Sequence, residues 1–107
     1  MYPIRVGASM TISEFGIFVN RIYSAAMGRS RETQKRKVRD LLRGLREAAG
    51  LRQVDLAARL KRPQSFVSKY ESGEKTLDFL EVKEVCLTLG VPLADFVRRY
   101  EEESDEA

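Results

Sequence analysis

The chain contains no histidine, no tryptophan and only one cysteine among its 107 residues. Without histidine there is no imidazole to act as a general base and no Cys/His set to bind zinc, and no Gly-rich phosphate loop is present. The acidic pair Glu101 and Glu102 lies in a terminal tail that nothing organises. These absences argue against an enzyme, and they predict that the protein requires neither a metal nor another cofactor.

A single cysteine, Cys86, excludes an intrachain disulfide and is typical of a reducing compartment, so we expect a cytoplasmic protein. Cys86 lies at an apolar position of a helical pattern, between Val85 and Leu87. A redox sensor needs an exposed thiol of low pKa, which these neighbours do not favour. Core packing is therefore the better explanation for Cys86.

Long apolar runs are also missing, even in the nearly uncharged residues 1–28, where Glu14 and Gly16 interrupt the most apolar stretch. This interruption argues against both a signal peptide and a membrane span. Three interpretations of the segment remain open. It is a strand or helix that packs on the domain or pairs with a second subunit, or it is a flexible arm, or it precedes the natural protein because translation starts at Met27 instead of Met1.

Charge is distributed unevenly along the chain. Residues 29–75 contain fourteen Lys and Arg against six Asp and Glu, whereas residues 76–107 contain three against nine. The overall net charge of +3 therefore hides a basic region and an acidic one. A basic region of this size is what a phosphate-binding surface requires.

Apolar residues recur with helical spacing from residue 33 to residue 100, and no segment reads as a strand. The pattern predicts an all-α, compact bundle of five short helices in a domain that spans residues 29–100, with an acidic tail at 101–107 that frays into solvent. The five helices are expected near 33–49, 53–60, 64–72, 79–89 and 93–100. Asp78 is a candidate N-cap, and Gly50, Gly73 and Gly90 follow helix ends.

The second and third of these helices are separated only by Lys61, Arg62 and Pro63. So short a connection makes two helices cross steeply and needs a small residue at the crossing, which Ala57 supplies. Residues 51–73 therefore read as a helix-turn-helix.

The same residues carry a family resemblance, which extends from about residue 37 to residue 99. The chain resembles the phage Cro and repressor type of helix-turn-helix domain, also called xenobiotic-response-element-like, at Gln53, Leu56, Ala57, Leu60, Gln64, Val67, Ser68, Glu71 and Gly73. It departs from that family in the turn, where Lys61 replaces the usual glycine and Arg62 replaces an apolar residue. A non-Gly residue in the left-handed region costs on the order of 1 kcal/mol.

An α-helix fits the major groove of DNA, where amide and cationic side chains distinguish the base pairs. On the third helix, the residues expected to contact bases are Gln64, Ser65, Phe66 and Lys69. For Phe66, partial burial against the second helix and contact with a thymine methyl group are both open. The residues expected to contact phosphates are Arg43, Arg52, Gln53, Arg62 and Lys75; Gln53 is included because a helix N-terminus favours an anion.

The resemblance implies two further contacts. Arg46 and Glu71 should form a partly buried ion pair between the first and third helices, which would fix the angle of the recognition helix. Gln53 should also brace Gln64, the first residue of that helix.

These features together predict a sequence-specific DNA-binding regulator of bacterial or phage type, acting on double-stranded DNA, with repression the favoured mode. Because one helix reads only a few base pairs, a homodimer on an inverted repeat is expected. The dimer surface is predicted at Leu93, Phe96, Val97 and Tyr100, extended by the N-terminal segment. The alternative is a protein-interaction module, such as an antitoxin or adaptor, whose N-terminal segment binds another protein.

Overall fold

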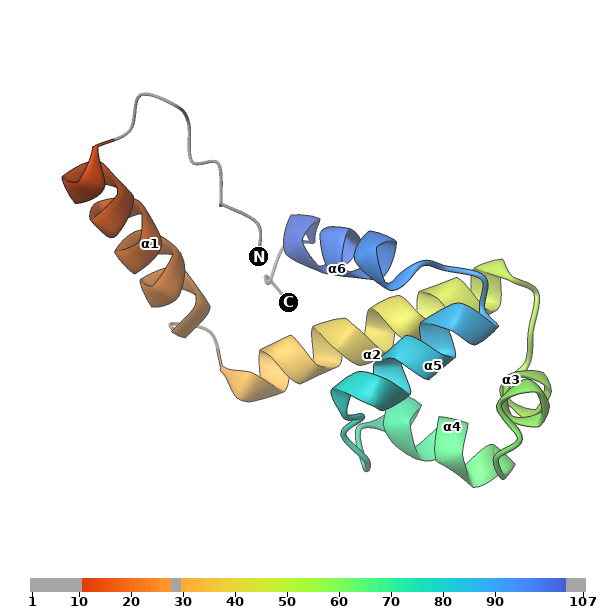
Figure 1. The fold of residues 1–107 in the computed structure, drawn as a ribbon. Coiled ribbons are helices and arrows are strands. Elements are labelled where there is room, and N and C mark those ends of the chain that lie inside the picture. The colour runs from red at the N-terminus through yellow and green to blue at the C-terminus, as the bar shows by residue number, and fades with distance from the viewer. Residues whose placement is uncertain (1–10, 28–29, 104–107) are drawn as a thin grey trace. The chain divides into compact units, whose positions relative to one another are not determined.

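The computed structural model describes residues 11–27 and 30–103, with the side chains of residues 23–27 left out. This part of the chain contains six helices and no strand (Figure 1). The all-α class is confirmed, but five helices are one too few, because the N-terminal segment also forms a helix. The chain divides after Ser30 into two units, which are described separately below.

Helix α1, Ile12–Met27, is the described element of the first unit. A reciprocal cap starts it: the Thr11 N–H donates to Glu14 Oε2 (2.7 Å), and the Glu14 N–H donates to Thr11 Oγ1 (3.1 Å). Hydrogen bonding to the Glu14 carboxylate, first from the Thr11 backbone and then from its side chain, lowers the pKa of Glu14 from its usual value. Several large apolar side chains of α1 are exposed to solvent, namely Ile12, Ile17, Phe18, Val19 and Ile22.

The second unit begins with α2, Arg31–Ala48. Its apolar residues recur every three or four positions, so that Leu42 is fully buried and Val38, Leu41 and Leu45 pack on the core beside it. The helix ends at Ala48, and Gly50 follows in the turn with a φ of 75°, in the left-handed region that suits glycine.

The helix-turn-helix consists of α3, Gln53–Leu60, and α4, Gln64–Ser72, at the boundaries that the sequence predicts. These two helices make the most extensive helix–helix contact in the structure. Ala57 is buried in the core beside Val67, as its place at the helix crossing requires. The second unit therefore has the steep helix crossing that the short connection predicted.

Lys61 ends α3 with φ 58° and ψ 43°, the left-handed conformation that glycine normally provides. In this conformation the Lys61 N–H donates to the Ala58 carbonyl (3.1 Å) and the Arg62 N–H donates to the Ala57 carbonyl (3.0 Å). The turn thus keeps its usual geometry despite the substitution. The left-handed conformation of Lys61 costs backbone strain on the order of 1 kcal/mol.

Helices α5, Phe79–Thr88, and α6, Leu93–Glu102, close the second unit. Asp78 caps α5 as expected, because its carboxylate accepts the Glu81 N–H (2.8 Å) while Glu81 Oε1 accepts the Asp78 N–H (3.0 Å). The core of this unit is built from Leu42, Leu56, Ala57, Phe66, Val67, Tyr70, Val85, Cys86 and Phe96.

The tail departs from the prediction at its start. Helix α6 continues through Glu102, so the first two residues of the expected frayed tail, 101 and 102, are helical. The remainder of the predicted tail, from residue 104, lies outside the described residues, as do residues 1–10 of the N-terminal segment. Within the described residues, no helix combines the length and the apolar character needed to cross a membrane.

Candidate nucleic-acid interface

Helix α4 has two faces of different chemistry. Phe66, Val67, Tyr70 and Glu71 are buried, and the residues between them are exposed. Before the last residue of the helix, Ser72, which is also exposed, the exposed side chains are Gln64, Ser65, Ser68 and Lys69. Residues 65, 68 and 69 are spaced three and four apart, so they share one face of the helix. An amide, two hydroxyls and an amine are therefore presented to solvent from one short helix.

Phe66 does not belong to this exposed face, which corrects its assignment as a base-contacting residue. Only 9% of it is exposed, and its ring packs edge-to-face on Tyr70 with centroids 5.7 Å apart. The Arg62 guanidinium lies 4.5 Å from the ring centroid on the outside. The i, i+4 spacing of the two aromatic residues was the signal in the sequence that favoured burial.

A buried polar network fixes the position of α4. The Arg46 guanidinium on α2 donates two hydrogen bonds to the Glu71 carboxylate, Nε to Oε2 at 2.7 Å and Nη2 to Oε1 at 3.0 Å. Arg46 also donates to the Leu51 carbonyl at 2.7 Å. Both side chains of the pair are over nine-tenths buried, and the hydrogen bonding to Glu71 raises the pKa of Arg46. Such a pair fixes geometry more surely than it adds stability, but removing one partner leaves a buried charge.

Gln53 completes the network from α3. Its Nε2 donates to Glu71 Oε1 at 2.9 Å, so the amide contacts the ion pair and not Gln64, where the family resemblance had placed it. Helices α2, α3 and α4 consequently meet at one carboxylate. Gln53 holds the N-terminus of α3 against α4.

Two of the expected phosphate-binding residues have only weak surface partners. Arg43 lies 3.5 Å from Glu47 one turn away on α2, and both side chains are more than half exposed. Arg52 bonds Asp55 at 3.0 Å, lowering the pKa of that carboxyl, but 79% of the arginine side chain is exposed. Lys69 on α4 is similar, 3.9 Å from Glu74. Pairs of this kind contribute little, so a phosphate could replace the carboxylate at small cost.

Arg62 and Lys75 are more firmly held. Both approach the same carboxylate oxygen, Glu81 Oε2, at 3.6 Å and 3.5 Å, and both lie over the Phe66 ring. Glu81 is itself only 13% exposed and caps α5. These two cations therefore link the end of α3 and the loop after α4 to α5. A phosphate contact from either one would compete with Glu81.

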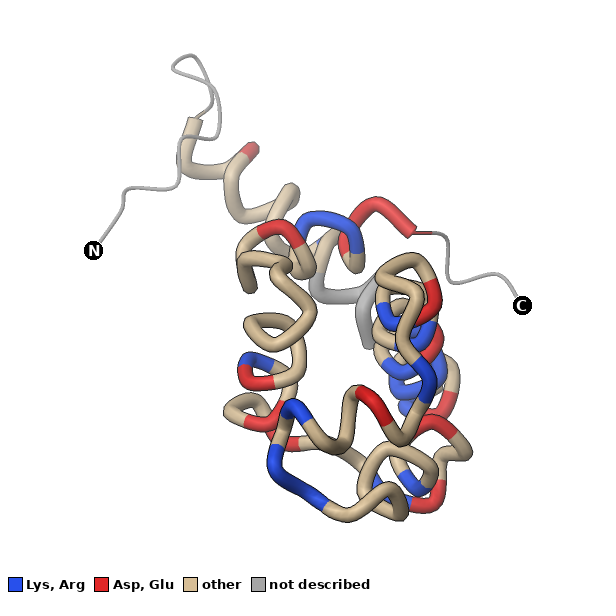
Figure 2. The backbone as a smooth tube through the Cα atoms, turned by 90° about the vertical axis from the view of Figure 1, so that its right-hand side faces the viewer, with Lys and Arg blue, Asp and Glu red and all other residues tan. Residues whose placement is uncertain are grey.

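The charge pattern of the fold agrees with the sequence. Basic positions recur along α2 and occupy the α3–α4 turn, whereas the described end of α6 is acidic (Figure 2). The candidate surface is therefore the exposed face of α4 together with the basic residues of α2, α3 and the adjoining turn.

The four residues of α6 that were expected at a dimer surface differ in how far they are buried. Phe96 is a core residue with 5% exposure, which corrects its assignment, and Leu93 packs partly buried against the same core. Tyr100 is half-buried, with the Lys37 amine of α2 4.2 Å from its ring centroid. Val97 is 43% exposed, so α6 alone presents a narrow apolar surface.

Cys86 is fully buried in the core, and burial raises the pKa of its thiol to about 11. A thiol of this kind is protonated at neutral pH and inaccessible to oxidants. Its role is packing, as the sequence predicts.

Comparison with known proteins places this geometry in a family. Residues 38–99 match the sequence model of a family described as "Helix-turn-helix domain". The fold is similar to the solved structure of an XRE-family like protein from Pseudomonas syringae pv. tomato str. DC3000, with a TM-score of 0.61 and 37% sequence identity over 78% of this chain and 93% of that one. No curated protein matches the chain. The family model spans more than half of the chain, and the chain covers nearly all of the solved relative. The protein therefore belongs to the XRE, or Cro/repressor-type, family of helix-turn-helix regulators.

Proposed function

We propose that the protein is a sequence-specific DNA-binding transcriptional regulator that places α4 in the major groove of its operator. The observation that carries this proposal is the division of α4 into a face locked by the Arg46–Glu71–Gln53 network and a face that leaves Gln64, Ser65 and Lys69 exposed. A rigidly held helix with free amide, hydroxyl and amine groups suits base recognition. Phe66 is not part of the proposed site, because its side chain is buried.

In this proposal, the exposed cations position the helix without reading sequence. Arg43 and Lys69 are the first candidates, since the side chains of their carboxylate partners are more than half exposed. Arg52 follows, because 79% of its side chain is exposed although it bonds the less exposed Asp55. Arg62 and Lys75 contribute only if the phosphate outcompetes Glu81. The acidic end of α6 points to a binding surface elsewhere on the unit, because phosphates repel carboxylates.

We further propose that the protein acts as a homodimer and represses transcription by occupying an inverted repeat. A single recognition helix discriminates poorly among genomic sites, whereas two helices about 34 Å apart read two half-sites about 10 base pairs apart. Val97 on α6 and several apolar residues of α1 are exposed at the places where the sequence predicts a dimer surface. The remaining interface assignments on α6 are weaker, because those side chains are engaged within the chain.

Selection of bound sequences from a random DNA pool, followed by titration of the selected site, tests the proposal. Gln64→Ala should cost about 1–3 kcal/mol on the selected site and relax preference at one base pair. Arg43→Ala is the matched contrast. It should weaken selected and random duplexes alike and lower the dependence of affinity on salt. Unchanged affinity and base preference in Gln64→Ala would refute the assigned recognition face.

The second candidate function is a protein-interaction module, favoured by the exposed apolar side chains of α1. The two functions differ in their response to salt. A DNA-binding protein loses affinity for random duplex steeply as salt rises, whereas an adaptor binds random duplex hardly at all.

A further inference from the structure

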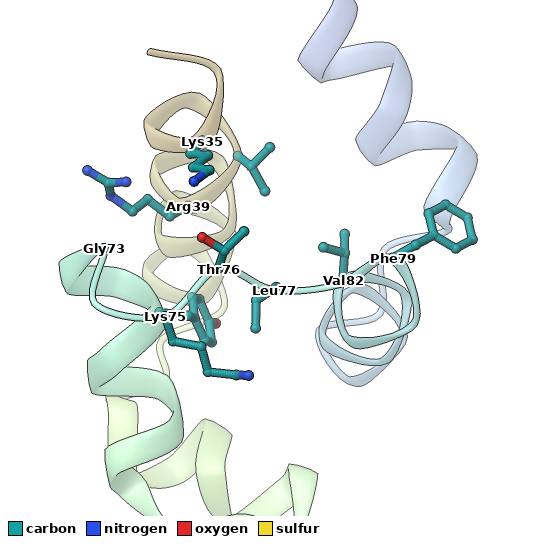
Figure 3. A pocket seen from close by; sticks show the side chains of 10 residues that line it. Lys35, Arg39, Gly73, Lys75, Thr76, Leu77, Phe79 and Val82 are labelled. Atoms are coloured by element: carbon teal, nitrogen blue, oxygen red, sulfur yellow. The ribbon is translucent and has the colours of Figure 1, made fainter. Parts of the chain in front are cut away.

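A cavity of about 170 Å³ lies in the second unit, away from the exposed face of α4. Its walls come from α2, the end of α4, the loop that follows α4, and α5. Figure 3 shows Lys35 and Arg39 on α2, Val82 and Phe79 on α5, and the loop between them. A cavity of roughly 150 Å³ holds one benzene molecule, so this one has room for a single ring with a small substituent.

The lining combines an apolar body with positive charge. Val38, Leu77 and Val82 supply aliphatic surface, while the lining residues include three cations and no carboxylate. Lys75 points away from Lys35 and Arg39 in Figure 3 and is paired with Glu81. Lys35 and Arg39 line the α2 wall, where Figure 3 shows Arg39 directed toward Gly73, on the side of the cavity away from Val82.

Arg39 is the better anchor of the two. Lys35 has a surface partner in Glu32 at 3.6 Å. The Arg39 guanidinium instead lies against Gly73 at the end of α4, so close that a Cβ added there would be 3.0 Å from Arg39 Cζ. The planar guanidinium offers paired N–H donors that match a carboxylate.

Tyr70 adds an independent sign that the cavity is incomplete. This residue lines the cavity and is 1% exposed, yet its hydroxyl has no hydrogen-bond partner. Buried polar groups are nearly always paired, and an unpaired one in a native protein calls for an explanation. Burial raises the pKa of Tyr70, so its hydroxyl stays protonated and can donate a bond.

We propose that this cavity binds a small aromatic monocarboxylate, with its carboxylate on Arg39 at the Gly73 end of the cavity and its ring against Val38 and Leu77. The uncharged apolar body of the cavity favours the ring over a purely ionic ligand such as phosphate. The absence of a carboxylate from the lining favours an anion over a cation.

The position of the cavity connects it to the recognition helix. Gly73 ends α4, and the Lys75 N–H in the loop donates to the carbonyl of Lys69, on the exposed face of that helix, at 3.0 Å. A ligand under the loop adds negative charge beside this helix end and fixes the loop in one arrangement. We infer, on the basis of the proposed function, that the bound carboxylate lowers the affinity for DNA. The expected decrease is about fivefold or more, which begins at the lower end of the effects typical of coupled sites.

The test is a titration of the full chain with benzoate in the absence of DNA, followed by amide chemical shifts in NMR, at constant ionic strength. We expect saturable shifts in the loop 73–78 and in α2. Benzamide, which keeps the ring but lacks the charge, and acetate, which keeps the charge but lacks the ring, should each bind at least about tenfold more weakly, a difference of roughly 1.4 kcal/mol. If benzoate causes no saturable amide shifts, or if all three compounds bind equally well, the proposed ligand site is wrong.

Two variants locate the ligand. Arg39→Gln should weaken benzoate about tenfold, whereas Arg36→Gln, the same change at an exposed position of α2 outside the cavity, should leave binding unchanged. Val82→Phe should fill the cavity and abolish binding. If Val82→Phe does not fold, as judged by circular dichroism, the arginine pair still decides the outcome. Equal affinity in the two arginine variants would refute the assignment of the carboxylate to Arg39.

The affinity for DNA is measured separately, on the selected duplex with and without benzoate. Lower affinity with benzoate supports the coupling, and unchanged affinity overturns it. A chain that binds benzoate but no DNA would refute the proposed function and leave the ligand site standing. A chain that binds DNA but not benzoate would refute the ligand site and leave the proposed function standing.

Discussion

Helices α4 and α1 both carry large apolar side chains, but they use them differently. In α4, Phe66, Val67 and Tyr70 are buried within the second unit, and the polar residues that remain outside are free for another molecule. In α1, Ile12, Ile17 and Ile22 are all more than half exposed. An exposed polar face on a packed helix is stable in water without a partner, whereas several large apolar side chains exposed together favour a helix that another surface covers.

The largest expected effect tests how firmly α4 is held. Arg46→Ala leaves the Glu71 carboxylate buried without its partner, so we expect a loss of about 3–5 kcal/mol in the free energy of unfolding, measured by urea denaturation. The control is Arg43→Ala, which removes an exposed partner of Glu47 and should cost no more than about 0.5 kcal/mol.

Combining Arg46→Met with Glu71→Leu should recover much of that loss, because neither charge then remains buried. A single Arg46→Ala variant as stable as Arg43→Ala would mean that the network does not position α4.

The next effect concerns the crossing of α3 and α4, where Ala57 is buried. Ala57→Leu should destabilise the second unit by about 1–3 kcal/mol through overpacking, seen as a lower melting temperature. Ala58→Leu, at the neighbouring exposed position of the same helix, should change stability by less than about 0.5 kcal/mol. Equal melting temperatures for the two variants would contradict the tight crossing.

A smaller effect, of opposite sign, is expected at the turn. Lys61→Gly removes the strain of a left-handed lysine and should stabilise the protein by about 1 kcal/mol, less some entropy that glycine gains in the unfolded chain. Arg59→Gly provides the contrast. It lies inside α3, where glycine should cost about 1 kcal/mol. A destabilised Lys61→Gly would show that the lysine side chain contributes more than its backbone strain costs.

The smallest effect on stability, and the sharpest test of the comparison, is expected in α1. Val19→Asp should leave the unfolding of the second unit unchanged within about 0.5 kcal/mol, since Val19 is exposed. If α1 forms an interface between two copies, light scattering should nevertheless show a shift towards monomer. Ser13→Asp, on the same helix, adds the same charge at a polar position and should not shift the mass. Identical masses for both variants and the parent would exclude α1 from the dimer surface.

Local chemistry accounts for the parts of the fold that the sequence predicts well. The boundaries of α3 and α4 follow from Gln53, the short Lys61–Pro63 connection and Gly73, and the start of α5 follows from the Asp78 cap. These features act over a few residues, so they can be recognised without tertiary information. For α1 the apolar pattern does not distinguish a helix from a strand or an arm. The local signal for a helix is the reciprocal cap that Thr11 forms with Glu14.

The assignments that failed depended on neighbours far away in the chain. Phe66 and Phe96 each lie at a helical position that suits either a core or an outer surface, and only packing against other helices decides between them. Gln53 likewise has several polar groups within reach in principle, and the Glu71 carboxylate, eighteen residues away, is the one that it bonds.

The amino-acid sequence by itself therefore determined the helical class, the helix-turn-helix, the basic region and the family, because helical spacing, caps and turn length are local properties. The tertiary structure alone decided which face of α4 is exposed, which cations are already engaged by Glu81, and that a cavity with an unpaired Tyr70 hydroxyl lies beside α4. These properties depend on burial and on distances between side chains from different helices, which no spacing along the chain specifies.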